Sequence, residues 1–384
     1  MGITNLNKVL APYIVRAQPK ALNAVIVDGN NIMYILSARI RKQLASTFID
    51  IKEFGKTEPI AIYRALNDAA LLAVSSFMQY VSSFSMNMVF VFDGKGAANG
   101  FRTYKLEEEA KRKESKDRTL LRAIDPYGLT SYKNFMEIVT AYTGLTDNDS
   151  QYRSERDFVK KNIDVSSELD ENMKYLTNIA MLHSPDFTIN LVKSKLIDTE
   201  KLGVTIIDSG DDEADWVIVR EARLAVPSLI ISADTDIFAF AGSLDRIYML
   251  DPKASNGDPI DVKATWDKAS ALMSHKPKVM IKILMMMYGC DFTAHKGAYT
   301  SCTFEDLNRI IKAGGDSMIL LRNLAPRSSI GKSMIPSNGL KNIYEYLLAF
   351  HGEDGDAVDI VVDHAFDVIF SNKQNGELDK TPAG

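Results

Sequence analysis

The sequence has few cysteines: among 384 residues there are only Cys290 and Cys302. Neither cysteine belongs to a pair with metal-ligand spacing, and two cysteines are too few for the disulfide framework of a small secreted protein. The five histidines also show no ligand spacing. We therefore expect neither a zinc site nor a disulfide scaffold, and we expect the protein to lie in a reducing compartment.

Long hydrophobic runs are missing as well. No apolar run approaches the roughly 20 residues of a membrane-spanning helix, and the first residues lack the apolar region of a signal peptide. The myristoylation motif requires Ser or Thr at the sixth position, where this chain has Leu6. The sequence thus predicts a soluble, intracellular protein of the nucleus or cytoplasm with no membrane partner.

The chain also has no excess of positive charge. It contains 45 Lys and Arg against 50 Asp and Glu, which gives a formal net charge of −5. Because nonspecific affinity for phosphate comes from Lys and Arg, this balance disfavours a general nucleic-acid coat protein. It does not exclude a nuclease, since bound cations offset the charge of an acidic site.

Five short apolar runs predict strands, at residues 24–27, 88–92, 204–207, 228–232 and 246–250. These runs are continuously apolar rather than alternating, which is typical of parallel strands that are covered on both sides. Helix-like stretches separate them, for example 60–84 and 213–225. The sequence therefore predicts an α/β fold: an open, mostly parallel, twisted sheet with helices on both faces.

Seven carboxylates fall where ligand sites form in a sheet of this kind. Loops at the carboxyl ends of parallel strands converge on one edge of the sheet. The carboxylates follow the predicted strands, open the next helix or close the later helix-like stretch 277–290, and they are Asp28, Asp93, Glu213, Asp215, Asp234, Asp236 and Asp291. Each one alone also fits a helix cap or a turn. As a set they would repel one another unless cations lay among them, so together they predict a metal site.

The ligand chemistry indicates Mg²⁺, with Mn²⁺ able to substitute and Ca²⁺ as an inert competitor. Carboxylate oxygens are the ligands that these hard cations prefer, and no histidine or cysteine accompanies them. Two such ions about 4 Å apart would support in-line hydrolysis of a phosphodiester bond. The predicted chemistry is therefore cleavage of a phosphate backbone.

The order of these motifs resembles that of the flap endonuclease family, whose PIN-like core is shared by xeroderma pigmentosum G-type nucleases and phage 5′ exonucleases. The matching blocks are MGITNL, VDGNNIMY, VFVFDGK, the EAD of GDDEADWV, and SADTDIFAF followed by YGCDF. The resemblance implies a structure-specific nuclease that removes 5′ flaps or ends from branched or 5′-ended DNA in replication or repair. It also implies that the seven carboxylates hold two Mg²⁺ ions.

The resemblance implies further site residues. Lys105 and Arg112 match the catalytic pair of the family's helical arch, and seven residues is close to two helical turns, so both would face one phosphate. The alternative is a solvated helix with Glu–Lys pairs. Tyr34 matches the tyrosine on which a base stacks, with a core aromatic as the alternative. Gly2 and Lys95 are the remaining matches predicted to bind nucleic acid.

The chain departs from the family after Asp291. Family members continue with a glycine-rich hairpin that grips the duplex, whereas this chain has DFTAHKGAYTSCTF with only Gly297. We expect side-chain cations to bind the duplex instead, with a merely solvated helix as the alternative. The candidates are the lysines that flank Asp291, which are Lys276, Lys278, Lys282 and Lys296, and the two chosen as binding residues are Lys278 and Lys296. No peptide that would bind a sliding clamp is recognisable.

The resemblance predicts a nuclease core over residues 1–262, with an arch and cap insertion at about 95–200, and a mostly helical C-terminal region over 263–384. Two alternatives to a DNA nuclease stay open at this point. One is an RNA endonuclease with the same metal site, and the other is a non-catalytic scaffold that retains the nuclease fold.

Overall fold

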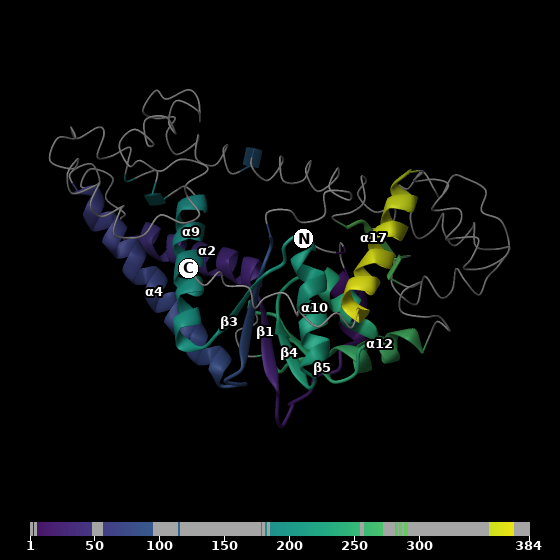
Figure 1. Ribbon diagram of the computed structural model, residues 1–384. Helices are drawn as coiled ribbons and strands as arrows, with labels where there is room; N and C mark the ends of the chain where they lie inside the picture. The colour runs from purple at the N-terminus through teal and green to yellow at the C-terminus, as the bar shows by residue number, and fades with distance from the viewer. Residues whose placement is uncertain are drawn as a thin grey trace, which may run out of the picture. The chain divides into compact units, whose positions relative to one another are not determined.

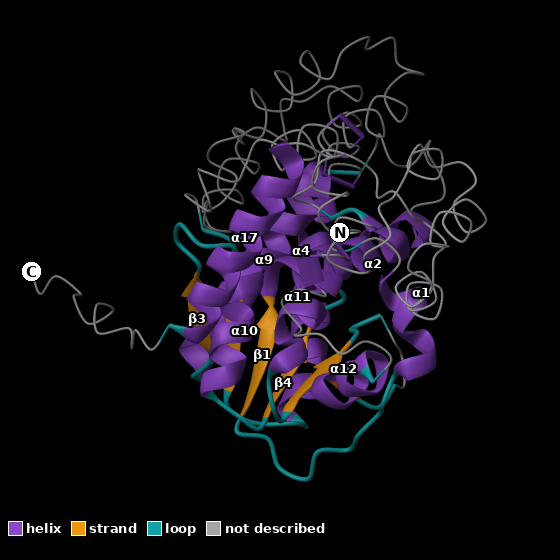
Figure 2. Ribbon diagram, turned by 90° about the vertical axis from the view of Figure 1, so that its right-hand side faces the viewer, coloured by secondary structure: helices purple, strands orange, loops and turns teal. Residues whose placement is uncertain are grey.

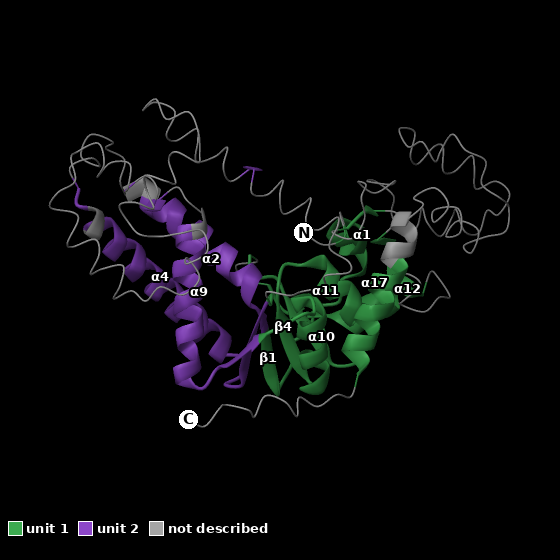
Figure 3. Cartoon of the chain, turned by 45° about the horizontal axis from the view of Figure 1, so that its top comes forward, with its two compact units in different colours: residues 1–26, 93–105, 208–384 green, residues 27–92, 106–207 purple. Residues whose placement is uncertain are grey.

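The computed structural model describes residues 3, 6–47, 57–94, 114–115, 178, 181–182, 185–253, 257–271, 281–282, 284–285, 288–290 and 353–371. The chain forms two compact units, each discontinuous in sequence (Figure 3). Unit 1 comprises Met1–Ile26, Asp93–Lys105 and Asp208–Gly384, and unit 2 comprises Val27–Phe92 and Leu106–Ile207. Most of the predicted arch and cap insertion lies outside the described residues.

Six strands form one mostly parallel sheet in the order β3-β2-β1-β4-β5-β6. Figure 2 labels β3, β1 and β4 of this sheet. They are β1 (Ala24–Asp28), β2 (Met88–Phe92), β3 (Thr205–Asp208), β4 (Ser228–Ile231), β5 (Ile247–Leu250) and β6 (Ile260–Asp261). In the parallel pair of β4 and β5, Ser228 is the partner of Ile247, whereas β6 runs antiparallel to β5 with Ile260 opposite Met249. The order reverses after β1, as in a doubly wound sheet. The predicted α/β fold with a mostly parallel sheet is confirmed.

The strands owe their burial to the apolar runs that predicted them. Every residue of β1 and β4 is buried, whereas the edge strand β3 is only partly buried. The strand at the opposite edge, β6, is two residues long, and no apolar run in the sequence predicts it. β5 begins one residue later than predicted because Arg246 has a φ of 58°, a left-handed conformation that does not continue a strand.

Three helices of unit 2 pack together and cover β2. They are α2 (Gly29–Thr47), α4 (Pro59–Ser82) and α9 (Pro185–Asp198). α9 packs against both α2 and α4, and α2 packs against β2 (Figure 1). Pro59 suits the first turn of α4, where its missing N–H costs no helical hydrogen bond. The helix predicted at 60–84 is confirmed.

Within the described part of unit 1, the structure defines the helices α1 (Leu6–Leu10), α10 (Ala214–Leu224), α11 (Thr235–Phe240), α12 (Val262–Ser270) and α17 (Glu353–Phe370). α10 packs on β4 and lies beside α17 (Figure 1), where the Arg223 guanidinium is 5.0 Å from the centre of the Phe370 ring. The helix predicted at 213–225 is confirmed. None of the helices within the described ranges is both long and apolar enough to cross a membrane.

A close backbone contact fixes the loop after β3 against the end of β2. The Gly94 amide donates to Ser209 Oγ at 2.9 Å, and this hydroxyl donates to the Asp212 carbonyl at 2.7 Å. A Cβ atom on Gly94 would lie 2.2 Å from the Gly210 carbonyl oxygen. Because the loop leads directly into Glu213, only glycine at position 94 allows α10 to begin where it does.

We predict that Gly94→Ala lowers the free energy of unfolding by about 3 kcal/mol, because the added methyl group meets backbone that cannot rotate away. Urea denaturation would measure the loss. The matched control is Gly203→Ala, whose Cβ meets nothing within 4 Å but whose φ is 86°. The control should lose only about 1 kcal/mol, the usual cost of a left-handed conformation. Equal losses in the two variants would refute the packing argument.

Candidate metal centre

Two of the predicted carboxylates lie at the start of α10. Glu213 is the N-cap residue and is 2% exposed, and Asp215 lies in the first turn, where the helix dipole favours negative charge. Asp93, which follows β2, accepts a hydrogen bond from the Ala214 amide at 3.3 Å. Asp93, Glu213 and Asp215 therefore lie together at the start of α10.

Two more carboxylates lie at the start of α11, directly after β4. The Asp234 side chain caps the helix by accepting from the Asp236 amide at 3.0 Å, while the Asp234 amide donates to Ser232 Oγ at 3.0 Å. Asp236 is 2% exposed. Capping, the ordinary role of an aspartate at this position, thus fixes the direction of the Asp234 side chain.

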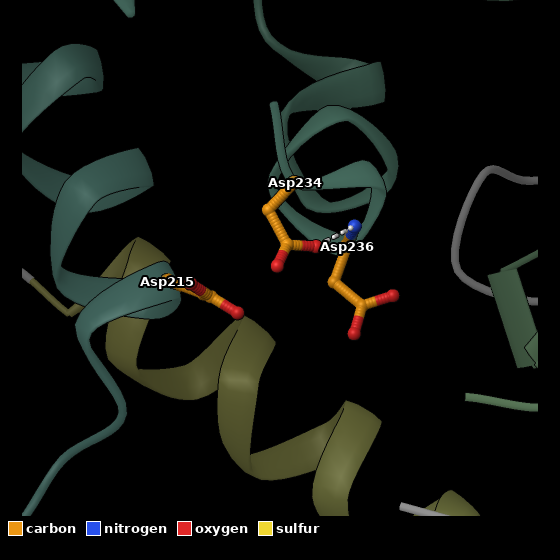
Figure 4. A group of neighbouring side chains, drawn as sticks. All are labelled: Asp215, Asp234 and Asp236. Atoms are coloured by element: carbon orange, nitrogen blue, oxygen red, sulfur yellow. Dashed lines mark hydrogen bonds between the residues drawn. The ribbon is translucent and has the colours of Figure 1, made fainter. Parts of the chain in front are cut away.

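The structure brings Asp215, Asp234 and Asp236 together. One carboxylate oxygen from each lies within 4.8 Å of the others, and Asp215 reaches from α10 toward the two aspartates of α11 (Figure 4). Opposite ligands of an octahedral Mg²⁺ ion lie about 4 Å apart, since each metal–oxygen bond is about 2.1 Å. The donor set and its spacing therefore fit Mg²⁺ or Mn²⁺ after small side-chain movements or with bridging water.

Two of the predicted site residues that the structure describes lie in unit 2. Asp28 ends β1, is 5% exposed, and accepts a hydrogen bond from the Asn31 amide at 2.9 Å, so it caps α2. Tyr34 is 49% exposed on α2. Its interpretation as a core aromatic is therefore wrong, while base stacking stays a prediction. The membership of Asp28 in the metal site also stays a prediction.

The other predicted site residues are not among those that the structure describes: Gly2, Lys95, Lys105, Arg112, Lys278, Asp291 and Lys296. Lys282, one of the lysines expected to flank the duplex, is described and forms ion pairs with Asp359 and Asp363 of α17, the second at 3.5 Å. Only 13% of its side chain is exposed. Lys282 is therefore engaged within the protein, contrary to the expected contact with DNA.

No local pattern in the sequence predicts several of the contacts that support the site. Thr235 Oγ1 donates to the Ile3 carbonyl at 3.1 Å and so ties the N-terminal segment to α11. His364 Nε2 of α17 lies 3.7 Å from Asp212 Oδ1, and its ring packs edge-on against Trp216 at 5.3 Å. These contacts span more than 140 residues, so no local pattern could predict them.

Comparisons with known proteins do not identify a family. The sequence matches no model of a protein family, and it matches no curated protein. The likeness to flap endonucleases therefore rests on the motif blocks in the sequence.

We predict that millimolar Mn²⁺ raises the unfolding temperature of the wild-type protein by on the order of 5 °C, because an ion that binds only the folded chain stabilises it. Asp236→Asn should abolish this rise. Without metal, the variant should unfold at the same temperature as the wild type or higher. Carboxylates about 4 Å apart repel by up to about 4 kcal/mol at intermediate dielectric, and the substitution removes part of that repulsion.

The matched control is Asp245→Asn, which removes an aspartate with 78% side-chain exposure and an ion-pair distance of 3.8 Å to Lys263. An exposed pair contributes roughly 0–1 kcal/mol, so this variant should keep the full response to Mn²⁺. Differential scanning fluorimetry with and without Mn²⁺ provides the measurement. A response to Mn²⁺ that survives in Asp236→Asn would remove this residue from the metal site.

Proposed function

We propose that this protein is a divalent-metal-dependent nuclease that hydrolyses phosphodiester bonds at flaps or 5′ ends of DNA, in replication or repair. The observation that carries the proposal is the triad of Asp215, Asp234 and Asp236, whose carboxylate oxygens lie within 4.8 Å of one another. A set of three acidic side chains at this spacing suits hard cations, and phosphoryl transfer is the reaction that such cations most often serve.

The place of the triad in the fold supports an active site over a chance cluster. Asp234 and Asp236 follow the carboxyl end of a buried parallel strand, which is where open α/β sheets bind their ligands. Asp93 and the buried Glu213 add two carboxylates at the start of α10. Three carboxylates at the start of α10 and two more at the start of α11 carry far more charge than capping requires.

The chain's own residues would prepare the site before substrate binds. Asp215, Asp234 and Asp236 would hold the metal, with Asp234 oriented by its hydrogen bond from the Asp236 amide. When bound, divalent ions favour loss of a proton from the attacking water and offset charge on the phosphate oxygens. Because the Asp234 cap and the loop at Ser209 fix the two helix starts, little rearrangement is needed when the metal binds.

A nucleic-acid substrate is also supported by Tyr34. Its ring is 49% exposed on α2, six residues after the buried Asp28. An exposed tyrosine of this kind suits stacking on a base, which is typically worth about 1–3 kcal/mol. Stacking and phosphate hydrolysis occur with both DNA and RNA, so the choice of DNA rests on the motif resemblance.

Cleavage assays with Mg²⁺ test the proposal most simply. We expect the wild type to cut a labelled 5′-flap DNA faster than nicked or single-stranded DNA, and faster than a matched RNA flap. Asp234→Asn should reduce single-turnover cleavage by about 10²-fold or more while DNA binding is retained or tightened, because the lost charge acts in the transition state. Asp245→Asn serves as the control. Faster cutting of the RNA would favour an RNA endonuclease, and no cutting at all would favour a scaffold.

The predicted arch pair gives a separate prediction. Lys105→Ala and Arg112→Ala should each lower the single-turnover rate on flap DNA at least 10-fold more than they lower affinity, because both cations are proposed to stabilise charge at the scissile phosphate. Rapid-quench cleavage and fluorescence anisotropy would supply the two numbers. Equal losses of rate and affinity would mark the pair as ordinary backbone contacts.

A further inference from the structure

Lys193 is a lysine of unit 2 whose ammonium group lies over an aromatic ring. Its Nζ atom, on α9, is 5.3 Å from the centre of the Phe92 ring. Phe92 is the last residue of β2 and is 3% exposed. The ring also packs directly on the first residue of α2, because a Cβ atom on Gly29 would lie only 2.5 Å from it. Lys193 therefore lies at the carboxyl end of β2, over a ring that also contacts the start of α2.

Among the described residues, no ion pair neutralises the charge of Lys193. No carboxylate of the described residues forms an ion pair with it, in contrast to Lys201, whose Nζ lies 2.9 Å from Asp198 Oδ1. A ring attracts an ammonium group through its quadrupole but carries no net charge, so the positive charge of Lys193 stays available to an anion. The side chain is partly exposed, which leaves that anion a route from solvent.

We propose that Lys193 binds a backbone phosphate of the nucleic-acid substrate. This inference rests on the proposed nuclease function, and it adds a phosphate contact that none of the motif blocks contains. The carboxyl ends of the strands are where an open α/β sheet places its ligand, and Lys193 supplies a positive charge at the carboxyl end of β2.

The Phe92 ring gives Lys193 an advantage over an ordinary surface lysine. A free lysine side chain loses up to about 2 kcal/mol of conformational free energy when a ligand immobilises it. Because contact with the ring already restricts the Lys193 side chain, part of this cost is met during folding. The ring is a positioning element, and the ammonium group makes the contact with phosphate.

The test measures binding of fluorescent 5′-flap DNA to the full-length protein across a KCl series, with Ca²⁺ replacing Mg²⁺ to slow cleavage. Lys193→Met keeps the aliphatic contact with Phe92 and removes the charge. It should weaken binding roughly 5-fold or more, as expected for a lost bond to a charged group. The slope of log affinity against log salt should fall by about 0.7–0.9, the contribution of one phosphate contact. Lys193→Arg should retain most of the affinity and the wild-type slope.

Lys201→Met is the matched control, because it removes one charge from the same unit at a lysine that is already paired. It should leave affinity and slope unchanged, and melting curves would verify that every variant is folded. Wild-type affinity and slope in Lys193→Met, with wild-type protein that binds and cuts the flap, would overturn the role of Lys193 alone. Wild-type protein that neither binds nor cuts DNA would overturn the proposed function and this inference with it.

Discussion

Repulsion among the carboxylates at the starts of α10 and α11 is the constraint around which unit 1 is arranged. Asp215, Asp234 and Asp236 bring oxygens within 4.8 Å, and Asp236 is almost completely buried. Charges that are buried close together destabilise a fold unless a cation or hydrogen-bond donors offset them. Hydrogen bonds from backbone amides offset part of this repulsion, and a divalent cation is the group best suited to offset the remainder.

The supporting contacts come from parts of the chain that are far apart in sequence. Gly94 and Ser209 fix the loop before Glu213, Thr235 binds the Ile3 carbonyl, and His364 approaches Asp212 from α17. α17 thus packs on α10, the helix that carries the proposed metal ligand Asp215. This arrangement links the stability of unit 1 to the geometry of its acidic site, because loss of any one support would release a helix start.

The sequence predicts the strands, and it offers capping as a role for Asp28 and Asp234, because both depend on local chemistry. A continuously apolar run such as 24–27 suits only a covered strand, and an aspartate after it is a natural cap. The boundary at Arg246 and the short strand β6 escape prediction because a left-handed residue and an antiparallel edge leave no hydrophobic pattern. The contacts of Ser209 and His364 cannot be predicted from the sequence because they depend on tertiary packing. The contact between Lys193 and Phe92 likewise becomes visible only in the structure.

The central claim is that Asp215, Asp234 and Asp236 hold a divalent cation. Anomalous scattering from crystals of the wild-type protein grown with Mn²⁺ would test it most directly, because the signal locates the ion without reference to any activity. We predict a peak within about 2.2 Å of carboxylate oxygens from these three residues. A map with no peak among them, or with Mn²⁺ bound only elsewhere on the protein, would contradict the account.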